Sequence, residues 1–395
     1  MKKIVQAWTG ISLVQRIVAG LVIGALLGMF VPSEGGIAIL GDVFVGALKA
    51  IAPLLVFFLV ISSLCYAGKS HGGVIRTVII MYMFSTFLAA IVAVTASSAF
   101  PVTLTLVDAA TDMAAPQGVA EVLRTLLMNV VTNPVQSLVS ANYIGILVWA
   151  VLIGIALRKA SDTTKQSLND ISAALSKTVT WIIQCAPFGI MGLVYNTVSV
   201  NGLSTFTEYG KLLAVLLGSM LFIYFVTNPI LVFWCIRKNP YPLIFKCLKK
   251  SAITAFFTRS SAANIPINME ACAEMGLDKD TYSVTIPLGA TINMDGAAIT
   301  ITVMTLAAAH TLGIAVDIPS AIILSILATL SACGASGVAG GSLLLIPMAC
   351  SLFGISNDIA MQIVGIGFII GVIQDSVETA FNSSSDLLLS ASAEF

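Results

Sequence analysis

Five strongly polar side chains interrupt an apolar segment near the end of the sequence. Asp375, Thr379, Asn382 and Asp386 follow one another at steps of four, three and four residues, and Glu378 lies close beside them. At about 3.6 residues per turn, these steps keep the four side chains on one stripe of a helix. A carboxylate buried in a bilayer is costly unless it is paired, so such residues usually mark an ion or substrate pathway. The stripe therefore predicts a polar binding site inside a membrane-spanning helix.

The composition is that of a membrane protein with many spans. Of 395 residues, 58% are hydrophobic and only 10% are charged, whereas about a quarter of the residues in a soluble domain are charged. The net charge is zero, with 19 basic and 19 acidic residues, so nothing in the charge balance indicates a nucleic-acid partner. The seven cysteines are scattered without a CxxC pair, which favours apolar packing over disulfides or metal ligands.

Six apolar spans fill the first part of the chain, and most have the 20 or so residues that a bilayer requires. They occupy residues 17–31, 37–66, 74–99, 143–157, 171–198 and 212–235. The fourth span is short, and the segment before it is expected to be an exposed connection with partial helix. Basic residues gather before the first span and in every second loop after it, so the N-terminus and these loops are expected in the cytoplasm. The first span is long enough to be a membrane helix and not a removed signal peptide.

After Lys250 the apolar pieces become short and are interrupted by small residues. One half-length run ends in TRSSAANIP at residues 258–266, and two later half-length runs flank SACGASGVAGGS at residues 331–342. We call the small-residue stretch of each segment its tip. Ile-Pro stands at or soon after each tip, and a long span that carries Asn and Asp comes next. Two matched units of opposite orientation are typical of inverted repeats that build a site at mid-membrane, although small residues can also simply permit close helix packing. The expected fold is an all-α polytopic membrane protein with eight transmembrane helices and two re-entrant helical hairpins.

The polar groups in these spans suit a hard cation. Asn293, Met294, Asp295 and Gly296 stand in the middle of one span. Glycine there indicates an unwound turn, and its carbonyl, amide and carboxylate oxygens suit Na+ better than a transition metal. The chain has only two histidines and neither is near another type of ligand, so zinc or copper chemistry is not expected.

The last span offers both an ion end and a substrate end. Asp386, with Asn382 one turn earlier, provides a second set of oxygens for a cation. Asp375 lies about 16 Å away along the helix axis, so it is better placed to pair with a substrate ammonium. Free amide groups at the Ser260 and Ser261 tip can bind a carboxylate. A ligand whose ammonium binds Asp375 and whose carboxylate binds the Ser260 and Ser261 tip would be an amino acid.

These residues resemble the dicarboxylate/amino acid:cation symporters, the family that includes the glutamate and aspartate transporters. The likeness covers essentially the whole chain and is strongest in four stretches: TRSSAANIP, PLGATINMDGAA at residues 287–298, the glycine-rich second tip, and QDSVETAFNSSSD at residues 374–386. Within the family, the details look most like the bacterial sodium-coupled carriers of serine and threonine. The resemblance implies Na+ as the coupling ion, L-serine and L-threonine as substrates, a homotrimer in membrane lipid, and a place in the bacterial inner (plasma) membrane.

The resemblance also assigns the residues of a substrate site. Asp375 would bind the substrate amino group, while Asn382 and the backbone and hydroxyls of Ser260 and Ser261 would hold its carboxylate. Val338 and the glycines around it would form the second hairpin as a gate. The substrate set is Ser260, Ser261, Val338, Ser342, Asp375, Glu378, Thr379 and Asn382.

Sodium sites are implied in the same way, each built from a carboxylate or from backbone carbonyls. One would combine the Asp386 carboxylate with carbonyls of Gly289, Asn293 and Asn382. A second would combine the carbonyls of Thr291 and Met294 with carbonyls of the second hairpin. A deeper one would combine Asp295 and the Asn293 side chain with Tyr82, Ser85 and Thr86 of the third span.

The sequence departs from the family pattern in the substrate site. Family members that take acidic amino acids have an arginine where this chain has Glu378, and that arginine grips the substrate's side-chain carboxylate. The family threonine beside the NMDG element is Ala297 here, and the proline of the second tip is Ala339. A second acid in the site would repel an acidic substrate, so we expect a small neutral one. We also expect Arg259 to pair with Glu378, so that neither charge is buried alone; the alternative is a neutral Glu378 that faces a helix.

The sequence thus predicts a membrane transporter and not an enzyme, importing serine and threonine with sodium by an elevator-like movement. Residues 1–240 would form the scaffold and oligomerisation spans, with the third span contributing to an ion site. Residues 241–395 would form the transport core, divided into hairpin 1 (241–275), a broken span (281–310), hairpin 2 (318–353) and the last span (357–390).

Other functions are less well supported by the residues. Proton coupling and a broader range of small neutral amino acids remain open, since a bilayer carboxylate can also cycle a proton. A channel would need rings of pore-lining charge or a filter motif. An intramembrane serine hydrolase would need a base near Ser260 or Ser336, and neither histidine lies in the hairpin segments.

Overall fold

The computed structural model describes residues 11–31, 35–66, 73–106, 128, 131–333, 335 and 340–395. All regular secondary structure within these residues is helical. Six helices are long and apolar enough to cross a membrane, and a seventh span results if the bent pair α8–α9 counts as one. The described chain is therefore that of an all-helical polytopic membrane protein. The predicted fourth span is α7 (Tyr143–Ala156), whose 14 residues rise only about 21 Å, so an eighth full span is not established by helix length.

The first three predicted spans agree with the helices to within four residues, whereas the fifth and sixth begin nine and seven residues earlier than predicted. α2 begins four residues earlier than expected because Ser12 and Gln15 form a capping box at its start. The helices are α2 (Leu13–Phe30), α3 (Gly35–Tyr66), α4 (Gly73–Ala99), α6 (Pro134–Val139), α8 (Asp162–Gln184) and α9 (Ala186–Asn201). α8 and α9 meet at a 55° bend where Pro187 enters the first turn of α9. Most of the expected connection at 101–141 lies outside the described residues.

The sixth span is continuous but contains a π-helical turn. α10 (Thr205–Phe222) and α11 (Asn228–Ile236) are joined by η2 (Ile223–Thr227). Pro229 follows directly in α11 and lacks an amide N–H, which is a usual cause of a local change in helical hydrogen bonding.

The second part contains two sets of short helices in the segments where hairpins were predicted, and we refer to them as hairpin 1 and hairpin 2. In the first, α12 (Tyr241–Cys247), η3 (Leu248–Ala252) and α13 (Ile253–Thr258) form one arm and α14 (Ser261–Glu274) the other. The arms lie side by side, because the Asn264 side chain in α14 donates to the Ser251 carbonyl in η3 at 3.2 Å. In the second, α17 (Ile318–Ala332) is one arm, and η4 (Ser342–Leu345) with α18 (Ile346–Ser351) the other.

The two long spans of the second part differ in continuity. The first is broken into α15 (Lys279–Ile292) and α16 (Asp295–Thr311). Asn293 and Met294 between them have non-helical backbone angles, which confirms the predicted unwound turn. The second, α19 (Asn357–Ser392), is one helix of 36 residues, or about 54 Å. Ser356 caps its first turn by accepting from the Ile359 amide.

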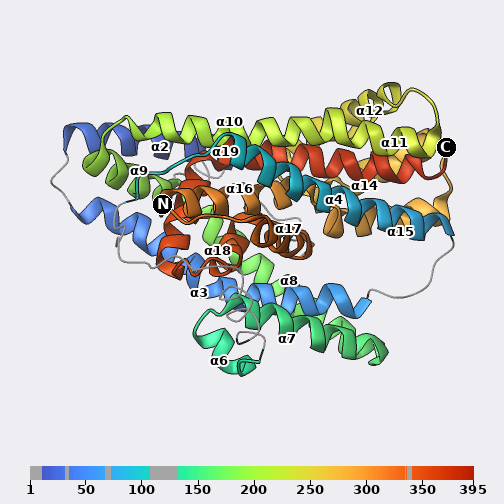
Figure 1. Ribbon diagram of the computed structural model, residues 1–395, viewed down its shortest axis with the longest axis horizontal. Helices are drawn as coiled ribbons and strands as arrows, with labels where there is room; N and C mark the ends of the chain where they lie inside the picture. Colours follow the sequence, from blue (N-terminus) through green and yellow to red (C-terminus); the bar gives the residue numbers. More distant parts are fainter. Residues whose placement is uncertain are drawn as a thin grey trace.

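α16 and α19 form the centre of the molecule. Figure 1 shows them between α10 on one side and α3 on the other. We compared the most apolar stretch of each span by the share of its residues that is buried. This share is 94% in the α15–α16 span and 83% in α19, but only 28% in α2. The outer helices thus present their apolar surface outward, and the two central spans can carry polar groups because protein surrounds them.

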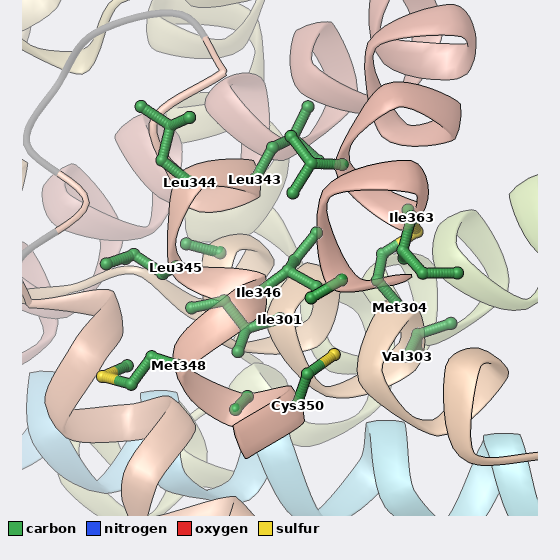
Figure 2. Close-up of a cluster of buried hydrophobic side chains, with 14 of the residues drawn as sticks. Ile301, Val303, Met304, Leu343, Leu344, Leu345, Ile346, Met348, Cys350 and Ile363 are labelled. Atoms are coloured by element: carbon green, nitrogen blue, oxygen red, sulfur yellow. The ribbon is translucent and has the colours of Figure 1, made fainter. Parts of the chain in front are cut away.

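An apolar cluster holds the second hairpin to these central helices. Leu343, Leu345 and Ile346 from η4 and α18 pack with Met304 of α16 and Ile363 of α19, as Figure 2 shows. All five side chains are at most 3% exposed. The second arm of hairpin 2 is therefore anchored below its tip by side-chain packing.

Close backbone contact joins α2 to α9. A Cβ atom at Gly24 would lie 2.4 Å from the carbonyl oxygen of Met191, which is too short for any side chain. We expect Gly24→Ala to lower the midpoint of thermal unfolding, because the helices must separate at a cost of about 1–3 kcal/mol. Gly210→Ala in α10 is the matched control, since nothing lies within 4 Å of its Cβ position. Equal midpoints for the two purified variants would contradict this account of the α2–α9 contact.

Candidate functional site

The polar site lies where three non-helical segments meet the middle of α19. They are the tip of hairpin 1 at Arg259 and Ser260, the break between α15 and α16, and the start of the second arm of hairpin 2 at Gly340. Broken backbone of this kind leaves amide and carbonyl groups without helical partners, and these can serve a ligand or a buried charge.

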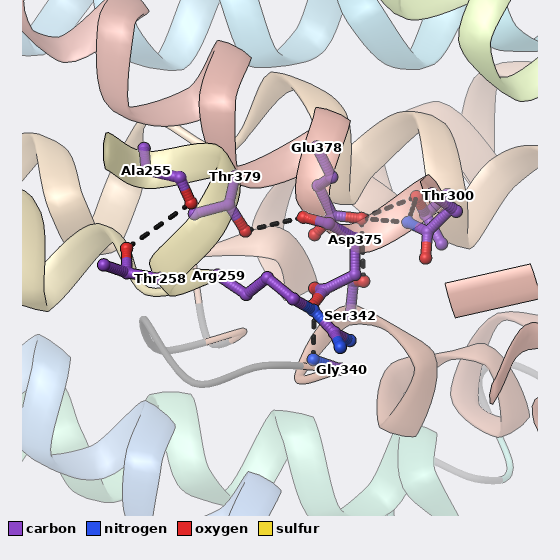
Figure 3. Close-up of polar contacts among 10 residues, drawn as sticks. Ala255, Thr258, Arg259, Thr300, Gly340, Ser342, Asp375, Glu378 and Thr379 are labelled. Atoms are coloured by element: carbon purple, nitrogen blue, oxygen red, sulfur yellow. Dashed lines mark hydrogen bonds and ion pairs between the residues drawn. The ribbon is translucent and has the colours of Figure 1, made fainter. Parts of the chain in front are cut away.

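Asp375 on α19 is the point at which the two hairpins meet. Its Oδ2 accepts from Arg259 Nε at 2.6 Å, and its Oδ1 accepts from the Gly340 amide at 3.1 Å. Figure 3 shows Arg259 and Gly340 approaching the carboxylate together. Arg259 and Asp375 are 7% and 2% exposed, so the pair is buried. The structure therefore links both hairpin tips through one carboxylate.

The predicted pairing of Arg259 with Glu378 is wrong in this structure, because the guanidinium contacts Asp375 instead. The two acids are three residues apart on α19 and so lie on one helix face. Helical spacing alone could not decide between them. The decision comes from neighbouring elements, which supply Glu378 with other donors.

Glu378 accepts three hydrogen bonds, all at Oε2. Thr300 Oγ1 of α16 donates at 2.7 Å, Ser342 Oγ of η4 at 3.0 Å and Gln374 Nε2 of α19 at 2.5 Å. Gln374 also donates to the Thr300 hydroxyl at 2.7 Å. Figure 3 shows this network beside Asp375. Sequence reasoning did not single out Thr300 or Gln374, although Gln374 is a polar residue one turn before Glu378 in an apolar span.

A cavity of about 20 Å³ lies among these side chains, which is roughly the space of a single water molecule. Six residues of the predicted substrate set line it, together with Arg259, Met294 and Ala335. The six are Ser261, Ser342, Asp375, Glu378, Thr379 and Asn382. Ser260 caps α14 by accepting from the Ala263 amide at 3.2 Å, and Val338 lies outside the described residues. The structure thus brings six of the eight predicted substrate residues together around one small cavity.

Asn382 and Thr379 are held by the backbone around them. Asn382 Oδ1 accepts from the Gly296 amide at 2.7 Å, and its Nδ2 points to the Met294 sulfur at 3.5 Å. Thr379 Oγ1 donates to the Asp375 carbonyl at 2.7 Å. Asn382 therefore joins the broken turn to α19, between the cavity and the deeper polar groups.

A first oxygen-rich cluster surrounds Asp386, which is 1% exposed. Asn293 Nδ2 donates to Asp386 Oδ1 at 2.9 Å, and the Tyr82 hydroxyl donates to the Asp386 carbonyl at 3.0 Å. Gly289 packs closely enough that a Cβ there would lie 2.8 Å from Asp386 Oδ1. Asp386 Oδ2 and Asn293 Oδ1 are buried without a hydrogen-bond partner in the described chain. Orphaned carboxylate and amide oxygens fit a hard cation.

A second cluster surrounds Asp295, which is 2% exposed. Its carboxylate accepts from four side chains of three other elements: Ser85 at 2.8 Å, Thr86 at 3.3 Å, and Asn228 and Ser385 at 3.4 Å each. Ser85 and Thr86 were expected here. Asn228 and Ser385 were not, and a lone asparagine inside the apolar sixth span was the signal for the former.

Tyr82 stands apart from Asp295, and Thr291 belongs to a different expected site. The Tyr82 side chain was expected beside Asp295, but its hydroxyl lies with Asp386, Thr285 and Ser390. Thr291 Oγ1 donates to the Leu288 carbonyl at 2.7 Å. The prediction did not specify which carbonyls of the second hairpin would complete a site with Thr291 and Met294, and residues 334 and 336–339 of its tip lie outside the described residues.

A buried polar network fixes hairpin 1 to α19. Asn264 Nδ2 donates to Ser251 Oγ at 2.9 Å and to Ser383 Oγ at 2.8 Å. Asn268 Nδ2 donates to the Ser383 carbonyl at 2.9 Å. All four residues are fully buried. Both arms of hairpin 1 are thus bonded to the same turn of α19, which positions the Arg259 tip beside Asp375.

The chain also matches known proteins over nearly its whole length. The model of the sodium:dicarboxylate symporter family matches residues 13–394. The chain is 57% identical to the serine/threonine transporter SstT of Streptococcus thermophilus strain LMG 18311, over all of this chain and 98% of the relative. It is 56% identical to the serine/threonine transporter SstT of Streptococcus agalactiae strain NEM316, with the same coverage.

Substitutions in the buried pair of Arg259 and Asp375 should lower the free energy of unfolding more than substitutions in an exposed ion pair. We expect Arg259→Gln or Asp375→Asn alone to lower the free energy of unfolding by about 3–5 kcal/mol, because each leaves a buried charge unpaired. The double variant should lose clearly less than the sum. Lys250 and Glu274, whose side chains are 45% and 47% exposed, form the control pair, where each change should cost less than about 1 kcal/mol. Additive losses at Arg259 and Asp375 would contradict a direct interaction.

Proposed function

Because the chain belongs to the sodium:dicarboxylate symporter family, we propose that this transporter imports L-serine and L-threonine together with Na+. The names of its relatives support the substrates. The observation that carries the proposal is the charge of the cavity, which two carboxylates and one guanidinium line. Asp375 and Glu378 would repel a dicarboxylic amino acid, whereas a neutral amino acid brings an ammonium that one of them can bind.

In this proposal Asp375 binds the substrate ammonium, and Asn382 with the Ser260 and Ser261 tip binds its carboxylate. Arg259 pairs with Asp375 in this structure, and the cavity of about 20 Å³ is too small for an amino acid. Substrate entry would therefore require the tip of hairpin 2 to move away and the ammonium to take the place of the guanidinium.

The coupling ions would be held by the two oxygen-rich clusters. Asp386 and Asn293 carry orphaned oxygens, and with carbonyls near Gly289 and Asn382 they would bind one Na+. Asp295 with Ser85 and Thr86 would bind another, with Asn228 and Ser385 as further neighbours. A third site would use Thr291 and Met294 carbonyls with hairpin 2. An ion in these places would offset the cost of burying the carboxylates and hold the broken turn together.

The transport movement would carry one part of the protein past the other. We propose eight membrane spans and two re-entrant hairpins, arranged as inverted repeats, with a cytoplasmic N-terminus in the plasma membrane and a trimeric assembly. Residues 241–395 would form the moving core and residues 1–240 mainly the scaffold. α4 and α10–α11 pack along α16 and α19 and share the Asp295 cluster through Ser85 and Asn228, which supports their moving with the core.

Uptake into proteoliposomes tests the proposal and its alternatives. Labelled L-serine should accumulate when an inward Na+ gradient is imposed and should fail to accumulate in sodium-free buffer under a proton gradient. Accumulation driven by protons alone would favour a proton-coupled carrier. Equal competition by all small neutral amino acids would favour the broader substrate range.

Asp386→Ala should raise the Na+ concentration that gives half-maximal uptake roughly tenfold or more, because the number of charged ligands tunes cation affinity. The measurement is the sodium dependence of serine uptake at saturating serine. Asp280→Ala, an exposed acid in the first turn of α15, is the control and should leave the dependence unchanged. Unaltered sodium dependence in Asp386→Ala would remove this residue from the ion site.

Glu378→Arg combined with Ala297→Thr should weaken serine uptake and favour acidic amino acids. The change removes the carboxylate that would repel a dicarboxylic substrate and introduces a guanidinium that can pair with one. Competition of L-aspartate against labelled L-serine measures the shift. An unchanged preference for serine would refute the role given to Glu378 in excluding acidic substrates.

A further inference from the structure

Asn228 in the sixth span brings a side-chain amide to the buried Asp295 carboxylate. Its Nδ2 lies 3.4 Å from Asp295 Oδ2 and 3.4 Å from Ser385 Oγ, and its Oδ1 accepts from Ser85 Oγ at 2.9 Å. Asn228 is fully buried. None of the ion pairs among the described residues involves Asp295. Neutral donors are therefore what compensates the Asp295 charge within the described chain.

The Asn228 amide differs in kind from the other donors to Asp295. Those donors are the hydroxyls of Ser85, Thr86 and Ser385. A hydroxyl carries a proton and two lone pairs, so it can donate to a carboxylate or turn and offer its oxygen to a cation. The NH2 group of an amide can only donate. It can compensate a negative charge, but it cannot ligate a metal ion.

The carboxylate itself favours the amide orientation with nitrogen toward Asp295. If the amide were turned over, its Oδ1 would take the place of Nδ2 beside Asp295 Oδ2. Two acceptor oxygens would then face each other without a proton between them, in a place that water does not reach. The orientation that donates to the carboxylate is therefore the stable one wherever no cation lies between the two groups.

Packing of the sixth span against α19 holds the amide in place. Tyr224 stacks on Phe381 with ring centroids 4.7 Å apart. Asn228 and Ser385, which are in contact, each lie four residues further along the same two helices. Asn228 also follows directly after the π-helical turn η2, and such turns are frequent at functional sites. The amide is thus fixed beside Asp295 by contacts one helical turn apart.

We propose that the Asn228 amide compensates the Asp295 charge when no cation is bound there, and that it therefore opposes cation binding at this site. Asn228 is then a positioning residue for the sodium-free carrier and not an ion ligand. The inference rests on the proposed function, in which Asp295 with Ser85 and Thr86 binds one Na+. It deepens that function by explaining how a carrier that has released its ions keeps a buried carboxylate stable on the return path.

This role predicts the sign of a change in sodium affinity. Removing the amide should cost the sodium-free protein more than the sodium-bound protein, because a bound cation also compensates the carboxylate. Anything that raises the free energy of the free form relative to the bound form tightens binding. Asn228→Leu should therefore bind Na+ more tightly than wild type. Loss of a true ligand, as in Ser85→Ala, should have the opposite effect.

Sodium titration of purified protein, followed by the midpoint of thermal unfolding, measures the affinity without transport. Asn228→Leu should lower the apparent Kd for Na+ by about three- to tenfold, which is less than a full hydrogen bond to a charged group would give, because the contact is long. Asn228→Ala, which adds no apolar bulk, should shift the Kd in the same direction. Ser85→Ala should raise the Kd.

Asn268→Leu is the matched control for loss of a buried amide. Asn268 is fully buried, and its hydrogen bonds in the described chain go to Asn264 and Ser383, not to an acid. This variant should lower the unfolding midpoint at every sodium concentration and leave the apparent Kd unchanged.

Proteoliposomes test the return step separately. Exchange is measured with liposomes preloaded with Na+ and unlabelled L-serine, and net uptake with liposomes that contain neither. Only net uptake requires the carrier to return without ions. The ratio of net uptake to exchange should fall at least about threefold in Asn228→Leu and stay at the wild-type value in Asn268→Leu.

The possible results separate this inference from its alternatives. Weaker sodium binding in both Asn228 variants would show that the amide turns over and ligates the ion, and an unchanged Kd would show a packing role only. Either result overturns the inference, as does an equal loss of net uptake and exchange in Asn228→Leu. If wild type shows neither stabilisation by sodium nor sodium-dependent serine uptake, the proposed function fails instead.

Discussion

The structure depends on the cost of burying carboxylates in the interior of a membrane protein. Asp295, Asp375, Glu378 and Asp386 are each at most 5% exposed and lie on two adjoining spans. A buried charge is tolerated only where donors, a counter-charge or an ion compensate for the lost water. The four are compensated in three ways: a guanidinium pairs with Asp375, neutral donors surround Glu378 and Asp295, and one amide donates to Asp386, whose other oxygen has no hydrogen-bond partner in the described chain. The positions of the hairpins and the broken helix follow from this need.

Non-helical backbone is what brings those donors to the right depth. The Gly340 amide reaches Asp375 and the Gly296 amide reaches Asn382 because neither is committed to a regular helix in the turn before it. Arg259 is held in a left-handed backbone conformation, φ 53°, that turns its side chain toward α19. Broken elements are stable in a membrane only when protein covers them, and α16 and α19 are the most deeply covered spans. The polar site and the buried centre of the fold are therefore one feature.

The two hairpins are attached in different ways, and the difference bears on how a transporter could open. Hairpin 1 is bonded to α19 by Asn264 and Asn268 through fully buried amides that have no role in the cavity. Near its tip, hairpin 2 contacts α19 through Gly340 and Ser342, which bond to the acids of the proposed substrate site. Opening hairpin 1 would break a structural network, whereas the two hydrogen bonds described near the tip of hairpin 2 go to acids that a substrate could engage instead. This asymmetry is consistent with the proposal that hairpin 2 is the part that opens.

The sequence by itself determined the helical class, the span limits to within a few residues for most spans, and the unwound turn at Asn293 and Met294. These features follow from hydropathy, glycine and proline, which act over short distances along the chain. Only the tertiary structure decided the partners of the acids. Spacing on α19 put Asp375 and Glu378 within equal reach of Arg259, and the choice depended on Thr300, Ser342 and Gln374, two of them from other elements. Likewise Tyr82 lies with Asp386 and Asn228 with Asp295. Helical periodicity determines on which side of its own helix a residue lies. Its hydrogen-bond partners depend on how that helix packs against helices that are distant in the sequence.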